Sequence, residues 1–193
     1  VTANFIIGYP GETKADLGIA IDADGDRLGL TNELGETVWP DRWLILLSRQ
    51  LLEKYPGSAI VFDVKCSQGL EEDIKSHGGI PIMWKTGHSY IKAKLSETNA
   101  ILGGEFSGHI FINEPVYYGF DDAIFTCFKI IEYISNTKKT FSQLLADTPY
   151  YVSSPTYQAP CSDKVKYEIV EKLTEEFKSE GLEVVDINGA RVK

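Results

Sequence analysis

Short apolar segments alternate with amphipathic segments along most of the chain. Continuous apolar character bounded by turn residues predicts strands at 18–22, 58–63, 80–84, 100–103 and 110–112. Apolar residues at helical spacing predict a helix that starts at Pro40 and others over 68–77, 89–97 and 121–135. We expect Asp41 to be the N-cap of the first of these helices. Strands that alternate with helices indicate an α/β domain with a largely parallel or mixed sheet.

Three parts of unequal size follow from this pattern. Residues 1–36 contain a strand, an acidic loop and a hairpin with arms at 28–32 and 35–39, and residues 37–148 form the α/β domain. A linker is expected at 148–155, and 156–193 has the pattern of a β-α-β unit. The chain begins without Met and stops just after the turn at Asn188-Gly189, so we expect a fragment of a longer protein whose C-terminal α+β domain is incomplete.

Charge and hydrophobic composition argue against two classes of protein. The 193 residues carry 28 acidic and 19 basic side chains, for a net charge of −9, which argues against a general nucleic-acid binder because such affinity comes from Lys and Arg on phosphates. No apolar run approaches the roughly 18 residues that span a bilayer, which argues against a membrane protein. Cys66, Cys127 and Cys161 are odd in number and far apart, as expected of reduced thiols in a cytoplasmic protein.

The first loop that carries chemistry is Asp22-Ala-Asp-Gly-Asp-Arg27, with acids at 22, 24 and 26. Carboxylates at alternate positions let a tight loop surround one hard cation. An EF-hand calcium loop would need Gly at its sixth position, where Arg27 stands, and helices on both flanks. A Mg²⁺ site with an adjacent arginine suits a phosphate ligand better, since metal and guanidinium share its charge. The alternative is a solvated acidic turn.

Two further loops follow predicted strands. Lys85-Thr-Gly-His-Ser89 opens a helix and offers cations and backbone amides to an anion, although His88 could also be a surface histidine at a helix start. Gly104-Glu-Phe-Ser-Gly-His109 offers Glu105 and Ser107 to sugar hydroxyls beside the titratable His109, although a polar hairpin turn has the same composition. Lys65 ends another strand, where a lone lysine is usually solvated.

All of these loops lie at the carboxyl ends of strands, where α/β sheets bind ligands. A metal site, several cations and a hydroxyl-binding loop in one place predict a phosphorylated sugar as the ligand.

At these residues the sequence resembles the α-D-phosphohexomutase superfamily, and within it the bacterial phosphomannomutase/phosphoglucomutase group. The resemblance rests on Asp22–Arg27, Lys85–Ser89 and Gly104–His109, with support from 62–66 and 119–122. It implies that 1–36 ends the second domain of such enzymes, that 37–148 is the sugar-binding third domain, and that 149–193 begins the fourth.

The resemblance also implies a reaction: interconversion of hexose 1-phosphate and 6-phosphate, of mannose, glucose or both, through a phosphoserine and a bisphosphorylated sugar. It implies Mg²⁺ as cofactor, a hexose 1,6-bisphosphate as activator and a phosphorylated hexose as substrate. The implied metal ligands are Asp22, Asp24 and Asp26. The implied catalytic residues are Arg27, Lys65, His88 and His109, with His109 first as general acid/base. The implied substrate-binding residues are Lys85, Thr86, Gly87, Ser89, Glu105 and Ser107.

Departures from the family pattern limit what this chain can do. Ala23 replaces the first glycine of the metal loop, Phe106 fills a variable position, and the printed residues contain neither the Ser-His-Asn-Pro phosphoserine loop nor the Arg-x-Ser-Asn-Thr phosphate clamp. We therefore expect the chain to be inactive by itself. The competing hypothesis is a non-catalytic module that binds metal or sugar phosphate.

Overall fold

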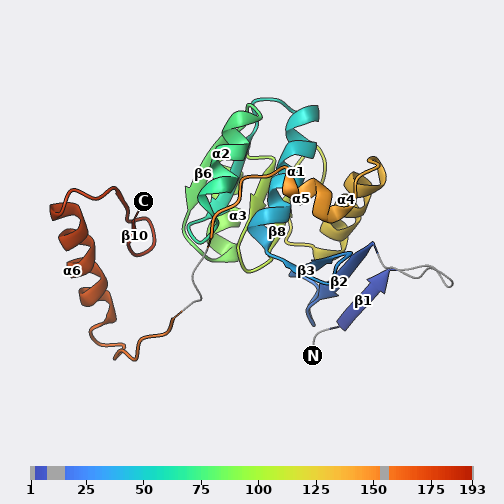
Figure 1. Cartoon of the computed structure of the whole chain (residues 1–193). Helices are drawn as coiled ribbons and strands as arrows, with labels where there is room; N and C mark the ends of the chain where they lie inside the picture. The colour runs from blue at the N-terminus through green and yellow to red at the C-terminus, as the bar shows by residue number, and fades with distance from the viewer. Residues whose placement is uncertain (1–2, 8–15, 153–156, 193) are drawn as a thin grey trace. The chain divides into compact units, whose positions relative to one another are not determined.

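The computed structural model describes residues 3–7, 16–152 and 157–192, and for 3–7 the backbone path (Figure 1). The chain divides into two compact units, Val1–Tyr151 and Val152–Lys193. The predicted boundary near residue 36 lies inside the first unit and stays a prediction.

A small antiparallel sheet opens the first unit. Its strands are β1 (Ala3–Ile7), β2 (Leu17–Ile21), β3 (Leu28–Asn32) and β4 (Thr37–Val38), paired in chain order. The apolar side chains of β2 and β3 alternate with less buried positions and are buried at Leu17, Ile19, Leu28 and Leu30. The strand at β2 excludes the EF-hand interpretation, which requires a helix there.

A second sheet forms the centre of the unit. Its strands are β5 (Ala59–Asp63), β6 (Ile80–Trp84), β7 (Leu102–Gly104) and β8 (Ile110–Ile112), in the order β6-β5-β7-β8. β5 runs parallel to both of its neighbours, and β8 is antiparallel to β7. The predicted α/β fold with a mixed sheet is confirmed.

Helices cover both faces of this second sheet (Figure 1). The helices that contact the sheet are α1 (Pro40–Lys54), α2 (Gln68–Ser76), α3 (His88–Thr98) and α4 (Ala123–Ser135), and α5 (Phe141–Ala146) packs on α1. Along β5, Ile60 and Phe62 join the large core that includes α1, whereas Val61 packs with Ile91 and Leu95 of α3. Burial on both faces explains why β5 is a continuous apolar run rather than an alternating one.

Two details of the helices differ from expectation. Trp39, not Asp41, is the N-cap residue of α1, because Pro40 takes the first helical position. The Asp41 carboxylate instead accepts a hydrogen bond from the backbone of Ser67 at 2.9 Å, and burial raises its pKa. Helix α5 was not predicted, although Thr140 and Gln143 form a capping box at its start.

The second unit contains a helix and a hairpin. They are α6 (Lys166–Ser179) and the antiparallel pair β9 (Val184–Val185) and β10 (Arg191–Val192). The turn at Asn188-Gly189 is confirmed, with Gly189 at φ +93°. The first strand of the expected β-α-β unit is not found among residues 157–165, where the chain is irregular; residue 156 and part of the predicted linker, 153–155, lie outside the described residues.

Within the described ranges, no helix is both long and apolar enough to cross a bilayer. The three cysteines are free thiols, two of them buried, as predicted.

Candidate active site

Four loops meet at the carboxyl ends of strands in the first unit. Residues 22–27 follow β2, 64–67 follow β5, 85–87 follow β6, and 105–109 join β7 to β8. Hydrogen bonds between backbone and side chains tie these loops to one another, so residues that are far apart in sequence form one cluster. The predicted convergence of the loops is therefore seen in the structure.

The acidic loop is a turn closed by its own first residue. Asp22 accepts hydrogen bonds from the backbone N–H of Asp26 at 3.2 Å and of Arg27 at 3.1 Å, and its other oxygen lies 2.5 Å from Arg27 Nε. Partial burial opposes ionisation of Asp22, but these bonds outweigh it and lower its pKa to about 2. Asp22, Asp24 and Asp26 bring carboxylate oxygens within 4.8 Å of one another.

These carboxylates suit a hard divalent cation. Three carboxylates supply the oxygen ligands that Mg²⁺ prefers, and Asp26 Oδ1 is buried without a hydrogen-bond partner among the described residues. Burial raises the pKa of Asp26; His109 opposes that rise, and the carboxylates of Asp22 and Asp24 reinforce it. A bound cation would give Asp26 Oδ1 a ligand contact, and it would reduce the repulsion between the clustered carboxylates.

The backbone joins the acidic loop to the loop at 105–109. Arg27 and His109 form an antiparallel β-bridge, and the N–H of Leu28 donates to the carbonyl of Gly108 at 3.1 Å. Gly108 has φ +100°, and a Cβ there would lie 2.8 Å from the Leu28 carbonyl oxygen. The position therefore requires glycine for both its conformation and its close approach.

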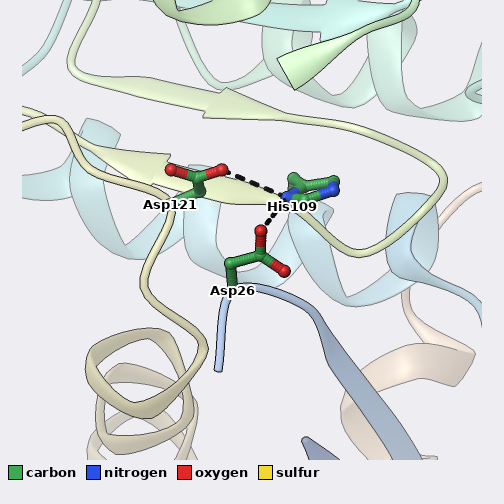
Figure 2. A group of neighbouring side chains, drawn as sticks. All are labelled: Asp26, His109 and Asp121. Carbon is green, nitrogen blue, oxygen red and sulfur yellow. Dashed lines mark ion pairs between the residues drawn. The ribbon is translucent and has the colours of Figure 1, made fainter. Parts of the chain in front are cut away.

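His109 is held among acids. Its Nδ1 lies 3.2 Å from Asp121 Oδ2 and 3.6 Å from Asp26 Oδ2 (Figure 2). Its ring stacks on that of His88 with 5.4 Å between centroids, and His88 Nδ1 lies 3.6 Å from the same Asp121 oxygen. Asp121 was not among the predicted site residues. It belongs to the Gly119–Asp122 segment, whose resemblance to the family was the one sequence signal for it.

Glu105 links two loops. It is 2% exposed, accepts a hydrogen bond from the backbone N–H of Gly87, and accepts another from the Ser107 hydroxyl at 3.1 Å. In this structure both carboxylate oxygens are engaged by the protein. Its predicted contact with sugar hydroxyls would use the remaining lone pairs, since each oxygen accepts two bonds.

Asp63 is a residue that sequence reasoning missed. It ends β5 fully buried, and it accepts hydrogen bonds from Thr86 Oγ1 at 3.0 Å, the Phe106 N–H at 3.0 Å and Cys66 Sγ at 3.1 Å. One carboxylate therefore joins three of the four loops. A charged residue that closes an apolar strand was the available signal, because a buried carboxylate needs several donors.

The remaining predicted residues surround this cluster. Lys65, Lys85, His88, Ser89 and Ser107 are exposed. Lys85 Nζ lies 6.0 Å from the centre of the Tyr90 ring. Thr86 and Gly87, predicted to bind substrate, donate to Asp63 and Glu105 and so hold the loops in place.

The mixed sheet with helices on both faces and polar loops at its carboxyl edge defines an α/β domain with a candidate ligand site at that edge. The sequence pattern described as phosphoglucomutase/phosphomannomutase, alpha/beta/alpha domain III, matches residues 39–151. The chain belongs to the phosphoglucomutase/phosphomannomutase family.

Similarity to individual proteins supports the same family assignment. The phosphomannomutase/phosphoglucomutase of Pseudomonas putida is 42% identical over 181 residues, which cover 94% of this chain and 39% of that protein. The phosphoglucomutase of Neisseria gonorrhoeae is 36% identical, with 93% and 39% covered. A crystal structure of a family member from Burkholderia thailandensis superposes with a TM-score of 0.83 at 42% identity, over 93% of this chain and 38% of that one. The chain thus spans about two fifths of the length of these relatives.

Proposed function

We propose that this chain supplies the metal loop and the sugar-binding domain of an enzyme that interconverts hexose 1-phosphates and hexose 6-phosphates, with mannose, glucose or both as the sugar. One observation carries the proposal. The β-bridge between Arg27 and His109 places the acidic loop directly against the predicted sugar loop. The candidate cation site and His109, the candidate proton-transfer group, would therefore act on the same phosphate group.

Mg²⁺ would be held by Asp22, Asp24 and Asp26, and when bound it supplies positive charge to a transferring phosphoryl group. Arg27 would act on the same phosphoryl group. Asp22 fixes the Nε edge of the guanidinium, while the side chain remains 52% exposed. A guanidinium anchored at one edge keeps its other donors in a fixed direction toward an anion.

His109 is the candidate for moving the proton of the reacting hydroxyl. Its Nδ1 faces the carboxylates of Asp121 and Asp26, while Figure 2 shows the second ring nitrogen on the opposite side of the ring. Two carboxylates beside Nδ1 favour a proton on that atom and leave Nε2 as the base. Asp121 is thus a positioning residue for His109.

Lys65, Lys85, His88 and Ser89 would bind the phosphate that is not being transferred, with help from the partial positive charge at the start of α3. Glu105 and Ser107 would bind the hydroxyls of the sugar. The activator would be a hexose 1,6-bisphosphate, and a cytoplasmic location is expected from its substrates and free thiols.

A coupled assay tests the function. The protein encoded by the complete gene is supplied with glucose, mannose or glucosamine 1-phosphate, Mg²⁺ and a hexose bisphosphate, with the 193-residue chain beside it. Turnover of glucose or mannose phosphate by the complete protein, and none by the chain, is expected because the printed residues hold no Ser-His-Asn-Pro loop. A folded, phosphorylated complete protein that turns over none of the three would leave a non-catalytic binding module as the better account.

A further inference from the structure

A second group of potential metal ligands lies beside the acidic loop. It consists of Asp26, His109 and Asp121, one from each of three chain segments, and their ligand atoms all lie within 4.8 Å of one another (Figure 2). Asp26 is the residue that it shares with the Asp22–Asp24–Asp26 group. Unlike that group of oxygen donors, this one includes an imidazole nitrogen.

The nitrogen at its centre has no hydrogen-bond partner among the residues that the structure describes. His109 Nδ1 is buried, and it lies at ion-pair distance from Asp121 at 3.2 Å and from Asp26 at 3.6 Å without a hydrogen bond to either. His77 gives a contrast within the same chain. It also lies 3.2 Å from a carboxylate, that of Asp73, yet its Nδ1 bonds to the Asp73 carbonyl at 2.9 Å. A buried ring nitrogen that faces two carboxylates and makes a hydrogen bond to neither of them is a candidate metal ligand.

The imidazole nitrogen among the ligand atoms favours an ion of the zinc class over Mg²⁺, and the spacing of the ligand atoms is compatible with such an ion. Zinc–ligand bonds of about 2.0–2.1 Å at tetrahedral angles place neighbouring ligand atoms about 3.3–3.4 Å apart. The observed separations from His109 Nδ1 are 3.2 Å to Asp121 and 3.6 Å to Asp26. Octahedral Mg²⁺ with bonds of about 2.1 Å would draw its ligands to about 3.0 Å and would select oxygen over nitrogen.

We propose that Asp26, His109 and Asp121 form a binding site for a divalent ion of the zinc class. This site is distinct from the oxygen-ligand site of Asp22, Asp24 and Asp26 but overlaps it at Asp26. Three protein ligands leave one tetrahedral position for water or an anion. If the function proposed above holds, an ion on Nδ1 keeps the ring's proton on Nε2, so the ring cannot accept a proton from a sugar hydroxyl and the ion inhibits turnover.

Binding can be measured on the 193-residue chain without any turnover, which separates this proposal from the proposed mutase activity. The chain would carry Cys161→Ser, because that exposed thiol is a competing zinc ligand. Zn²⁺ is titrated against a chromogenic chelator, and Co²⁺ absorption reports the geometry. We expect one tight site whose Co²⁺ form has the intense visible bands of tetrahedral coordination.

Matched variants assign the ligands. His109→Asn and Asp121→Asn should weaken Zn²⁺ binding by at least on the order of 100-fold, because loss of an outer partner of a metal ligand already costs up to about that much and these variants change the ligands themselves. His77→Asn, at the other carboxylate-paired histidine, and Asp24→Asn, in the oxygen-ligand group alone, should leave Zn²⁺ binding unchanged. Circular dichroism confirms that each variant is folded. Absence of a tight Zn²⁺ site, an octahedral Co²⁺ spectrum, or undiminished binding by folded His109→Asn would each overturn the proposal.

Discussion

Arg27 and His109, far apart in the sequence, lie opposite each other in an antiparallel β-bridge between the acidic loop and the loop that precedes β8. The bridge makes one structural unit of the acidic loop, which is the proposed cation site, and the loop that carries His109. Any change that separates them should affect metal binding and proton transfer together.

Gly108→Ala tests that unit. The new Cβ would meet the Leu28 carbonyl oxygen at 2.8 Å, and φ is +100°, so the bridge must shift and the free energy of unfolding should fall by about 2–4 kcal/mol. Gly25→Ala is the matched control: φ is +80° but no described atom lies within 4 Å, so about 1 kcal/mol is expected. Chemical denaturation of the chain measures both, and equal losses would show that the contact with Leu28 is unimportant.

His109→Asn should lower kcat of the complete protein by on the order of 10²–10⁴-fold if His109 moves the proton. His88→Asn, which changes the stacked but 61% exposed partner ring, should mainly raise KM for the phosphosugar. Steady-state kinetics with glucose 1-phosphate and mannose 1-phosphate distinguish a loss in kcat from a rise in KM. A full kcat in His109→Asn would assign proton transfer elsewhere.

Asp24→Asn should weaken Mg²⁺ binding to the chain by roughly tenfold to hundredfold, since it removes one of three clustered carboxylates. Its side chain is exposed, so stability should change little. Asp16→Asn provides the control, because it removes another exposed charge just before β2. Calorimetric titration with Mg²⁺ gives both affinities; identical values for the two variants would contradict the assigned ligand.

Glu33 should make the chain sensitive to acid. Its partial burial opposes ionisation, but hydrogen bonds from Ser142 and Thr140 outweigh this and lower its pKa to about 2. Because the folded pKa lies below the unfolded value, the stabilisation is complete above about pH 4.5 and is lost as the pH falls toward 2.

Glu33→Gln should therefore lower the free energy of unfolding by on the order of 1–2 kcal/mol at pH 7 and by roughly half as much at about pH 3. Denaturation at the two pH values measures the difference. Glu53→Gln, at an exposed position of α1, should show no such change. A loss that is the same at both pH values would mean that charge is not the cause.

Asp63→Ala should destabilise the chain by about 3–5 kcal/mol, because it leaves donors from three loops unpaired inside the protein. Asp63→Asn keeps the shape and part of the acceptor capacity, so its loss should be smaller. Thermal denaturation of both variants makes the comparison. If Asp63→Ala were neutral, the loops would have to be held by other contacts.

Much of the fold follows from local pattern. The strand at 80–84 and the helices near 68–77 and 121–135 were predictable because their apolar spacing and their Gly or Asp boundaries agree. Asp41 was misjudged because Pro40 takes the first helical position, which makes the residue before it, Trp39, the N-cap even though its side chain makes no capping hydrogen bond. The short α5 has too few residues to show a period, and its Thr140–Gln143 capping box was its one clear signal.

The site was predictable only in part. The acidic, histidine and glutamate loops could be found because each holds its chemistry within about six adjacent residues. The residues that orient these loops could not be found in this way. Asp121 approaches His109 from beyond β8, and Asp63 approaches Phe106 from another strand, so these contacts exist only after the sheet has formed.

The buried Asp63 carboxylate also limits which changes of loop length this site tolerates. Since it is bonded to Thr86, to Phe106 and to its own loop, an insertion or deletion in either partner loop would leave a charged group unpaired in the interior. Loop length is thereby fixed by a residue that need not touch a substrate. If these loops bind a sugar as proposed, a change in the preferred sugar would come from substitution of exposed side chains such as Lys85 and Ser107, on loops whose backbone stays the same.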